Sequence, residues 1–229
     1  PTDNNAILFR QGQDEIVEPY VEAGKIEIVA DQWVDNWDAA NALKIMENIL
    51  TAAGNDIDAV VASNDGTALG ALQAMKAQGL AGKVPISGQD ATADGCNSIV
   101  KGELTVSILK DIRNLSPLAV DMMDKLLKGE AIEGLENYTM AELTNDPSKE
   151  GEVPCVFLPV QQVNKDNVQE LVVDSGFQSA EDVYRDVEQA DSGGDEAGAG
   201  REHDGEEPGD KVSARWRAAV DQCPAGYDG

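Results

Sequence analysis

The apolar residues of this chain follow two different spacings in turn. Between residue 6 and about residue 175, short runs rich in β-branched residues alternate with longer stretches in which apolar residues recur three and four positions apart. The first spacing is typical of β-strands and the second of amphipathic helices. The alternation therefore predicts repeated units of strand, helix and strand.

Several of the short runs are apolar on both faces, as buried parallel strands require. Five strands are predicted, at residues 26–30, 57–62, 84–87, 105–109 and 156–160. Six helices are predicted, at residues 5–22, 38–52, 67–78, 91–101, 117–128 and 165–174. Helices that connect parallel strands make right-handed crossovers. We therefore predict an α/β fold with a doubly wound parallel sheet in a three-layer sandwich.

Glycines mark the predicted ends of the helices. Five helix-like segments are followed by a glycine where a left-handed C-cap would fall: Gly24, Gly54, Gly79, Gly102 and Gly129. After the last of these, residues 129–153 lose their periodicity and are rich in polar residues and glycine. We interpret this stretch as an exposed loop or a short irregular strand.

The C-terminal part has a different composition. From about residue 186 the chain is rich in Gly, Asp and Glu and poor in residues that offset the entropy of ordering. We predict an acidic, disordered tail over residues 178–229. Within it, residues 212–220 contain Trp216 and fit either a short amphipathic helix or a solvated turn. His203 has no ligand or nucleophile beside it, and we interpret it as a solvated tail residue.

The chain is strongly acidic, with 43 acidic and 17 basic residues and a formal net charge of -26. Such a charge repels phosphate backbones and anionic membranes, so nucleic acid is not an expected partner. The acidity fits adaptation to high salt and ordinary acidity equally well. No apolar run is long enough for a transmembrane helix. Cys96, Cys155 and Cys223 are too widely spaced for a disulfide framework or a zinc motif.

Polar and aromatic residues follow four of the predicted strands. Trp37 lies in the loop after the first strand, Asn64 and Asp65 follow the second, Asp90 follows the third, and Lys110 follows the fourth. Ligands of open α/β sheets bind beyond the carboxyl ends of the strands. An indole, an amide, carboxylates and an amine are therefore expected at one rim of the sheet.

This set of groups favours a neutral, polyhydroxylated ligand. Amides and carboxylates bond vicinal hydroxyls, and an indole packs against the C–H face of a sugar ring. Trp37, beside a polar loop, is a better stacking candidate than Trp33, which we interpret as a packing residue. A nucleotide is not favoured, because no glycine-rich phosphate-binding motif follows a strand. Simpler interpretations stay open: Asn64, Asp65 and Asp90 fit helix caps, and Lys110 fits a solvated charge.

Ordered motifs carry a family resemblance from residue 1 to about residue 177. They are Pro1-Thr-Asp-Asn-Asn-Ala6, Gly24-Lys-Ile26, Asp31-Gln-Trp-Val-Asp35, Asn41-Ala-Leu-Lys-Ile-Met-Glu-Asn48, Ile57-Asp-Ala-Val-Val-Ala-Ser-Asn-Asp65 and Ile86-Ser-Gly-Gln-Asp90, and they close with Asp174-Ser-Gly-Phe177. In these motifs the chain closely resembles the bacterial periplasmic D-xylose-binding proteins of ABC sugar importers, which have the type I periplasmic-binding fold.

The resemblance implies two similar α/β lobes that close on one sugar in the cleft between them. It assigns residues 1–110 and 159–177 to the second, C-terminal lobe and residues 111–158 to the first lobe, most of which would precede residue 1. We accordingly expect an N-terminally truncated protein. The elements at 111–158 are then expected to have uncovered apolar faces, which favours self-association.

The resemblance also implies which residues contact the sugar: Asn5, Trp37, Asn64, Asp90 and Lys110, with Trp37 stacking on the ring. The neighbours of Lys110 depart from the family, which tends to have an aromatic residue and a proline beside the lysine. The implied partners are xylose or a related pentose and the membrane subunits of an ABC permease. No cofactor and no metal is implied. The implied location is the periplasm or the cell exterior, with membrane anchoring through the N-terminal region as an option.

Two other functions stay open from the sequence. The effector-binding domain of a sugar-responsive transcription regulator has the same fold and would differ by an upstream DNA-binding motif. A sugar-converting enzyme would need a nucleophile, a metal site or a carboxylate pair, and Asp65 and Asp90 lie on neighbouring strand ends. Two carboxylates are also common in sugar receptors, so we predict binding without catalysis.

Overall fold

Helices and strands alternate through the first half of the chain. The computed structural model describes residues 3–144, 146–187 and 216–220. The first elements are α1 (Asn4–Glu22), β1 (Ile26–Asp31), the 3₁₀ turn η1 (Asp35–Trp37), α2 (Ala39–Ala53), β2 (Ala59–Val61), α3 (Asp65–Ala77), β3 (Ile86–Gln89), α4 (Ala93–Val100) and β4 (Val106–Leu109). Up to β4, each helix and strand predicted from the sequence is present, with ends that differ by a few residues.

Shorter elements follow in the second half. They are α5 (Ile112–Lys128), β5 (Glu136–Thr139), α6 (Met140–Thr144), β6 (Glu152–Cys155), β7 (Gln161–Val163), the π-helix η2 (Gln169–Asp174), α7 (Ala180–Val183) and β8 (Trp216–Val220). Strands β5 and β6 form a separate antiparallel ribbon.

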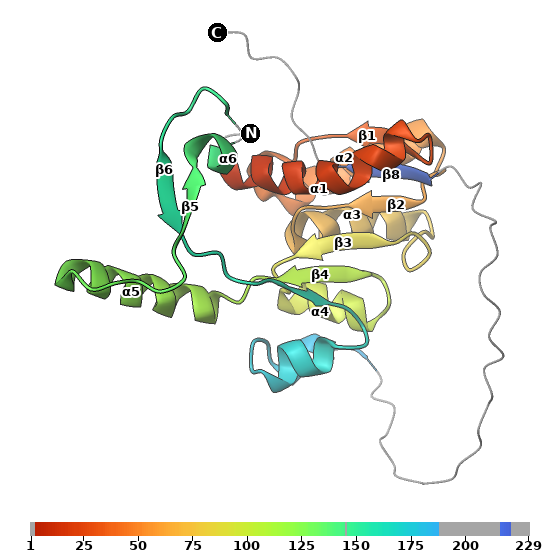
Figure 1. Cartoon of the computed structure of the whole chain (residues 1–229). Helices are drawn as coiled ribbons and strands as arrows, with labels where there is room; N and C mark the ends of the chain where they lie inside the picture. Colours follow the sequence, from red (N-terminus) through yellow and green to blue (C-terminus); the bar gives the residue numbers. More distant parts are fainter. Residues whose placement is uncertain (1–2, 145, 188–215, 221–229) are drawn as a thin grey trace, which may run out of the picture.

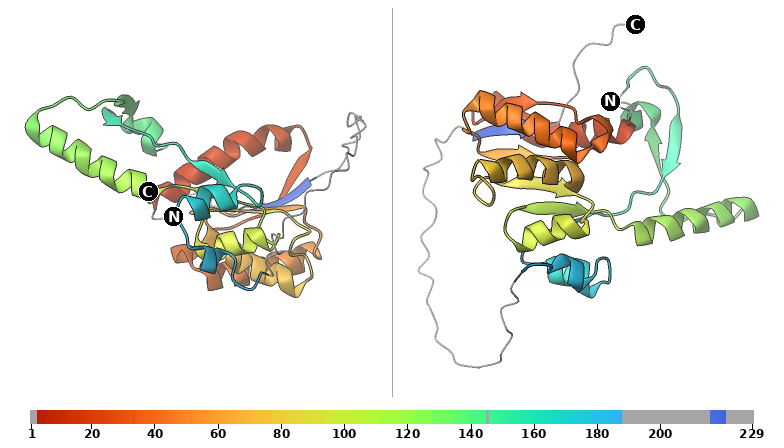
Figure 2. Two further views of the ribbon diagram at one scale, coloured as in Figure 1. Left: turned by 90° about the horizontal axis from the view of Figure 1, so that it is seen from below. Right: turned by 180° about the vertical axis from the view of Figure 1, so that it is seen from behind.

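A six-stranded sheet in the order β1-β8-β2-β3-β4-β7 forms the centre of the molecule. Its strands are parallel except for the edge strand β7, which is antiparallel to β4. Helix α1 lies on one face of the sheet, and α2 and α3 lie on the other (Figure 2, left). The doubly wound α/β sandwich predicted from the sequence is confirmed, with one antiparallel edge strand.

The main core lies between the sheet and helices α2 to α4. Leu72, Met75, Ile86 and Ile99 are each at most 1% exposed. Helices α2 and α3 approach so closely that a Cβ atom on Gly70 would overlap the backbone carbonyl of Ala39. This contact fixes the start of α2 against the centre of α3.

The helix ends follow the glycine pattern of the sequence. All five glycines expected to terminate helices have positive φ, between 61° and 73°. Only glycine adopts this conformation at little cost, so the residue type fixes where each helix stops.

The second half of the chain differs from the sequence prediction. The strand predicted at 156–160 is absent, because β6 ends at Cys155 and β7 begins at Gln161. Its apolar side chains are uncovered, with Phe157 65% and Val160 57% exposed. The stretch predicted as a loop or irregular strand contains α6 and the ribbon of β5 and β6. Helix α5 begins five residues earlier than predicted, because the Asp111 carboxylate caps it by accepting from the Arg113 N–H.

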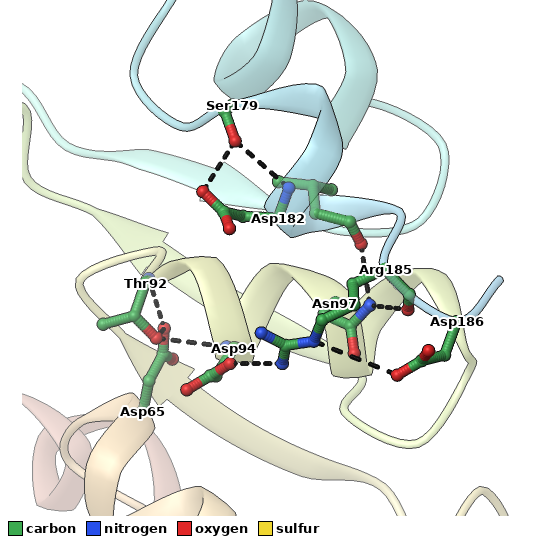
Figure 3. A network of polar contacts seen from close by, with 10 residues as sticks. Asp65, Thr92, Asp94, Asn97, Ser179, Asp182, Arg185 and Asp186 are labelled. Atoms are coloured by element: carbon green, nitrogen blue, oxygen red, sulfur yellow. Dashed lines mark hydrogen bonds and ion pairs between the residues drawn. The ribbon is translucent and has the colours of Figure 1, made fainter.

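Two parts of the predicted disordered tail are ordered. The Asn97 side chain in α4 donates to the carbonyls of Val183 (2.9 Å) and Arg185 (2.7 Å), and Arg185 pairs with Asp94 at 2.7 Å (Figure 3). These bonds hold α7 against α4, so the boundary predicted at residue 178 is too early. Residues 216–220 form strand β8 rather than a helix or turn. Residues 188–215 and 221–229, with His203 and Cys223, lie outside the described residues.

Helix α5 extends away from the sheet (Figure 1). It has no buried residue. Six of its large apolar side chains are between 56% and 82% exposed: Ile112, Leu115, Val120, Met123, Leu126 and Leu127. An amphipathic helix with a bare apolar face is the feature that the sequence led us to expect for residues 111–158.

Candidate functional site

The residues that follow the parallel strands meet in one open pocket at the carboxyl ends of β1 to β4. Its volume is about 320 Å³, which lies at the lower end of the range for small-molecule sites. All five residues predicted to contact a ligand line it. The lining residues are Asp3, Asn5, Phe9, Trp37, Asn64, Gln89, Asp90 and Lys110.

Helix α1 brings the N-terminal residues to this pocket because two polar contacts fix it over the strand ends. The Arg10 guanidinium lies 2.9 Å from the Asp31 carboxylate at the end of β1. The Gln13 amide donates to the Ser63 hydroxyl, just after β2, at 3.2 Å. Asn5 and Phe9, one helical turn apart, therefore face the same rim as the strand-end residues.

An aromatic wall forms one side of the pocket. The rings of Trp37 and Phe9 meet edge to face, with centroids 6.4 Å apart and an interplanar angle of 68°. The Trp37 Nε1–H donates to Asp3 Oδ2 at 3.2 Å. Trp37 has φ 56°, a left-handed conformation that is uncommon for a large residue, and this conformation in the turn η1 sets the position of the indole ring. Trp33 does not line the pocket, and its packing role stays a prediction from the sequence.

Asn64 combines two roles that the sequence left as alternatives. Its Oδ1 accepts from the backbone N–H and from the hydroxyl of Thr67, both at 2.8 Å, and so caps α3. The side chain also lines the pocket. Because the oxygen is engaged by the helix, the Nδ2 group is the part of Asn64 that can serve a ligand, as a donor.

Asp90 and Lys110 form the charged side of the pocket. The Lys110 ammonium lies 3.1 Å from Asp90 Oδ1, and both side chains are 41% exposed. The same ammonium lies 5.0 Å from the centre of the Phe9 ring. A pair this exposed contributes at most about 1 kcal/mol to stability. The two groups therefore remain free to bond a ligand, one as acceptor and one as donor.

Asp65 does not share the pocket with Asp90. Its side chain is fully buried beneath the rim, where its carboxylate accepts from Thr92 and Ser107. Burial raises the pKa of Asp65, and the bonds from Ser107 and Thr92 oppose this rise. Since the donors occupy both oxygens, the geometry does not support the carboxylate pair considered for an enzyme.

Three lining residues were missed from the sequence. Phe9 was detectable, because it lies four positions after Asn5 on the same helix face. Gln89 belongs to the strand-end set but ends β3 immediately before Asp90. Asp3 caps α1 through a 2.9 Å bond to the Asn5 N–H, and nothing local shows that its second oxygen reaches Trp37.

Within residues 3–144 and 146–187, no cluster of three or more His, Cys, Asp or Glu side chains is arranged to hold a metal ion. Over the same part of the chain, no helix combines the length and hydrophobicity needed to cross a bilayer. Cys96 is a buried free thiol, and Cys155 is a half-buried one.

Relatives are found both by sequence and by structure. The family described as "Periplasmic binding protein domain" matches residues 1–131. The D-xylose-binding periplasmic protein of Haemophilus influenzae is 48% identical over 184 residues, covering 80% of this chain and 53% of that protein. The protein of the same name from Escherichia coli is 49% identical over 177 residues, covering 77% of this chain and 51% of that protein.

A solved structure agrees in fold. An ABC transporter solute binding protein from Clostridium phytofermentans with bound β-D-glucose superposes with a TM-score of 0.67 and 27% identity, over 80% of this chain and 57% of that chain. This chain spans about half the length of the curated relatives that it matches. The family match covers more than half of the chain, and the chain belongs to the periplasmic binding protein family.

Proposed function

We propose that this chain binds a monosaccharide, D-xylose or a related pentose, as part of the solute receptor of an ABC sugar importer. The observation that carries the proposal is the pocket itself, in which the Trp37 and Phe9 wall faces amide, carboxylate and ammonium groups. Such a site offers a ring-packing surface and both donors and acceptors for hydroxyls. The names of the two D-xylose-binding relatives support the same ligand class.

Each lining residue has a distinct role in this proposal. Trp37 packs against the C–H face of the sugar. Asn64 donates through Nδ2, Asp90 accepts, and Lys110 donates, so that neighbouring hydroxyls find partners of both kinds. Asn5 is exposed at the start of α1 and contributes a carboxamide to the same pocket.

The receptor function is favoured over regulation and over catalysis. The two curated relatives are named as periplasmic sugar-binding proteins rather than as regulators. We propose reversible binding without turnover, in the periplasm, with delivery to the membrane subunits of a permease. Attachment to the membrane remains a prediction from the sequence.

We further propose that residues 111–158 pack against a second α/β lobe, while residues 1–110 and 159–177 form the sugar-binding lobe. The support is the bare apolar face of α5 together with its position outside the main sheet (Figure 1). A face of this kind on an otherwise acidic surface is typical of an interface.

Calorimetric titration tests the proposal. Xylose, ribose, arabinose and glucose are titrated into this chain, and into a chimera that adds the half of the Haemophilus influenzae relative that the chain does not match. We expect pentose binding at least in the chimera. Trp37→Ala should weaken it about tenfold or more, equivalent to ~1.4 kcal/mol. Tyr20→Ala, which removes a half-exposed aromatic ring outside the pocket, is the matched control.

Two results would contradict the proposal. One is the absence of pentose binding in both proteins. The other is an affinity that Trp37→Ala and Tyr20→Ala change equally. Turnover of a bound pentose would contradict the claim of binding without catalysis.

A further inference from the structure

A buried network lies directly beneath the pocket and is centred on Asp65. Its Oδ2 accepts from the Thr92 backbone N–H at 2.7 Å and from the Thr92 hydroxyl at 3.0 Å (Figure 3). Its Oδ1 accepts from the Ser107 hydroxyl at 2.7 Å. One carboxylate at the start of α3 therefore joins the loop after β3 to strand β4.

The network holds three consecutive backbone amides of that loop. The Asp90 N–H donates to the Ile108 carbonyl at 2.7 Å. The Ala91 N–H donates to the Ser107 hydroxyl at 3.0 Å, and that hydroxyl donates in turn to Asp65. The Thr92 N–H donates to Asp65 directly. Two of the three amides thus depend on the Asp65 carboxylate.

The loop needs such anchors because its backbone is strained. Asp90 has φ 94° and Ala91 has φ 45°, both in the left-handed region that residues with a Cβ atom seldom adopt. Conformations of this kind persist only where the surroundings hold them in place, and they are frequent at ligand sites. Here they turn the Asp90 side chain into the pocket beside Lys110.

The space around the Asp65 carboxylate is shaped by two glycines. A Cβ atom on Gly88 would overlap Oδ1, and one on Gly95 would overlap Oδ2. Gly95 lies within helix α4, where alanine is ordinarily the better residue. A helical glycine at this position is explained by the room that the buried carboxylate requires.

We propose that Asp65 is a positioning residue of the sugar site, which sets the direction of the Asp90 carboxylate through Thr92 and Ser107 without touching the ligand. This inference rests on the proposed function for its effect on affinity. Its structural part, the control of the 90–92 loop, stands on the network alone.

The test measures hydrogen exchange of the amides at 90–92 and sugar affinity in the same variants. Asp65→Asn should speed exchange at Ala91 and Thr92 by about tenfold or more and weaken pentose binding to a similar extent. Asn97→Ala is the matched control, because it removes two hydrogen bonds of a buried side chain from α4 on the side facing α7. It should leave exchange at 90–92 unchanged.

Two further variants separate positioning from general stability. In an Asp90→Ala background, Asp65→Asn should have little additional effect on affinity, since its action is transmitted through Asp90. Gly95→Ala keeps the Asp65 charge but displaces the carboxylate, and it should reproduce the exchange phenotype. Ser107→Ala removes a single oxygen and replaces Asp65→Asn if that variant does not fold.

The outcomes are distinct. Unchanged exchange at 90–92 in Asp65→Asn and Ser107→Ala overturns the inference. The inference is also overturned if Asp65→Asn weakens sugar affinity as much in the Asp90→Ala background as it does in the unmodified chain. Absence of sugar binding in the unmodified proteins contradicts the proposed function, and the exchange data then decide the positioning role by themselves.

Discussion

The contact between α2 and α3 gives a quantitative test of the fold next to the pocket. Gly70→Ala places a Cβ atom on the Ala39 carbonyl oxygen and within 2.9 Å of the Ala42 Cβ. Alanine is better than glycine inside a helix by about 1 kcal/mol. Overpacking costs about 1–3 kcal/mol, and the upper end applies here because a backbone carbonyl cannot rotate away. We expect Gly70→Ala to be destabilised by ~2 kcal/mol.

Gly12→Ala is the matched control, because a Cβ atom on Gly12 of α1 meets nothing within 4 Å. It should stabilise the protein by about 0.5–1 kcal/mol through helix propensity alone. The two substitutions are chemically identical, and their stabilities should differ by ~3 kcal/mol. Urea unfolding followed by circular dichroism measures this difference, which corresponds to a shift in midpoint of about 1 M or more.

The displacement should also reach the pocket. Helix α2 begins two residues after Trp37, so moving it away from α3 moves the aromatic wall. Where pentose binding is measurable, Gly70→Ala should weaken it and Gly12→Ala should not. Equal stability of the two variants would refute the close packing of α2 on α3 and, with it, the expected effect of this contact on Trp37.

Three other expectations concern charge and the bare helix. Raising NaCl from about 0.1 M to about 2 M should raise the melting temperature by about 4–8 °C, because salt screens the net charge of -26; this shift corresponds to ~2 kcal/mol in the free energy of unfolding. An unchanged melting temperature would favour ordinary acidity over salt adaptation. Burial raises the pKa of Asp65 above 3.8 in the folded state, so the contribution of Asp65 to the free energy of unfolding is complete below about pH 3.8 and is lost as pH rises through the folded pKa. The free energy of unfolding of Asp65→Asn, measured against pH, should lack this decline. A decline equal to that of the unmodified chain would assign it to other groups. Met123→Lys with Leu127→Lys on α5 should reduce self-association in sedimentation velocity with little loss of stability, because both side chains are more than 60% exposed, whereas unchanged association would place the contact elsewhere.

The sequence predicted the fold and the pocket where the signal was local. Residues such as Asn64 and Lys110 were found because parallel strands bring their carboxyl ends to one edge, so position along the chain implies position in space. The role of Asp65 was not predictable, because its donors Thr92 and Ser107 are distant in sequence and its burial depends on Gly88 and Gly95. Hydrophobic spacing identifies apolar faces but not what covers them.

The second half of the chain shows the same limit. The apolar run at 156–160 was predicted as a buried strand, yet Phe157 and Val160 are exposed in the link between β6 and β7. Strand β8 carried no recognisable local signal, because its partners β1 and β2 lie far back in the chain. The low hydrophobicity of this part of the sequence therefore predicted disorder, whereas backbone pairing with β1 and β2 orders β8.

The place of β8 in the sheet has a consequence for how the molecule assembles. Among the described strands, β1 pairs with β8 alone, and β8 separates it from β2, the next strand along the chain. Pairings between such distant segments are slow to form, because a long loop must close before any contact compensates for it. On the ribosome, where synthesis proceeds at about 5–20 residues per second, helices α2 to α4 and strands β2 to β4 can associate early. Strand β1 (Ile26–Asp31) cannot complete this pairing until β8 (Trp216–Val220) has been synthesised.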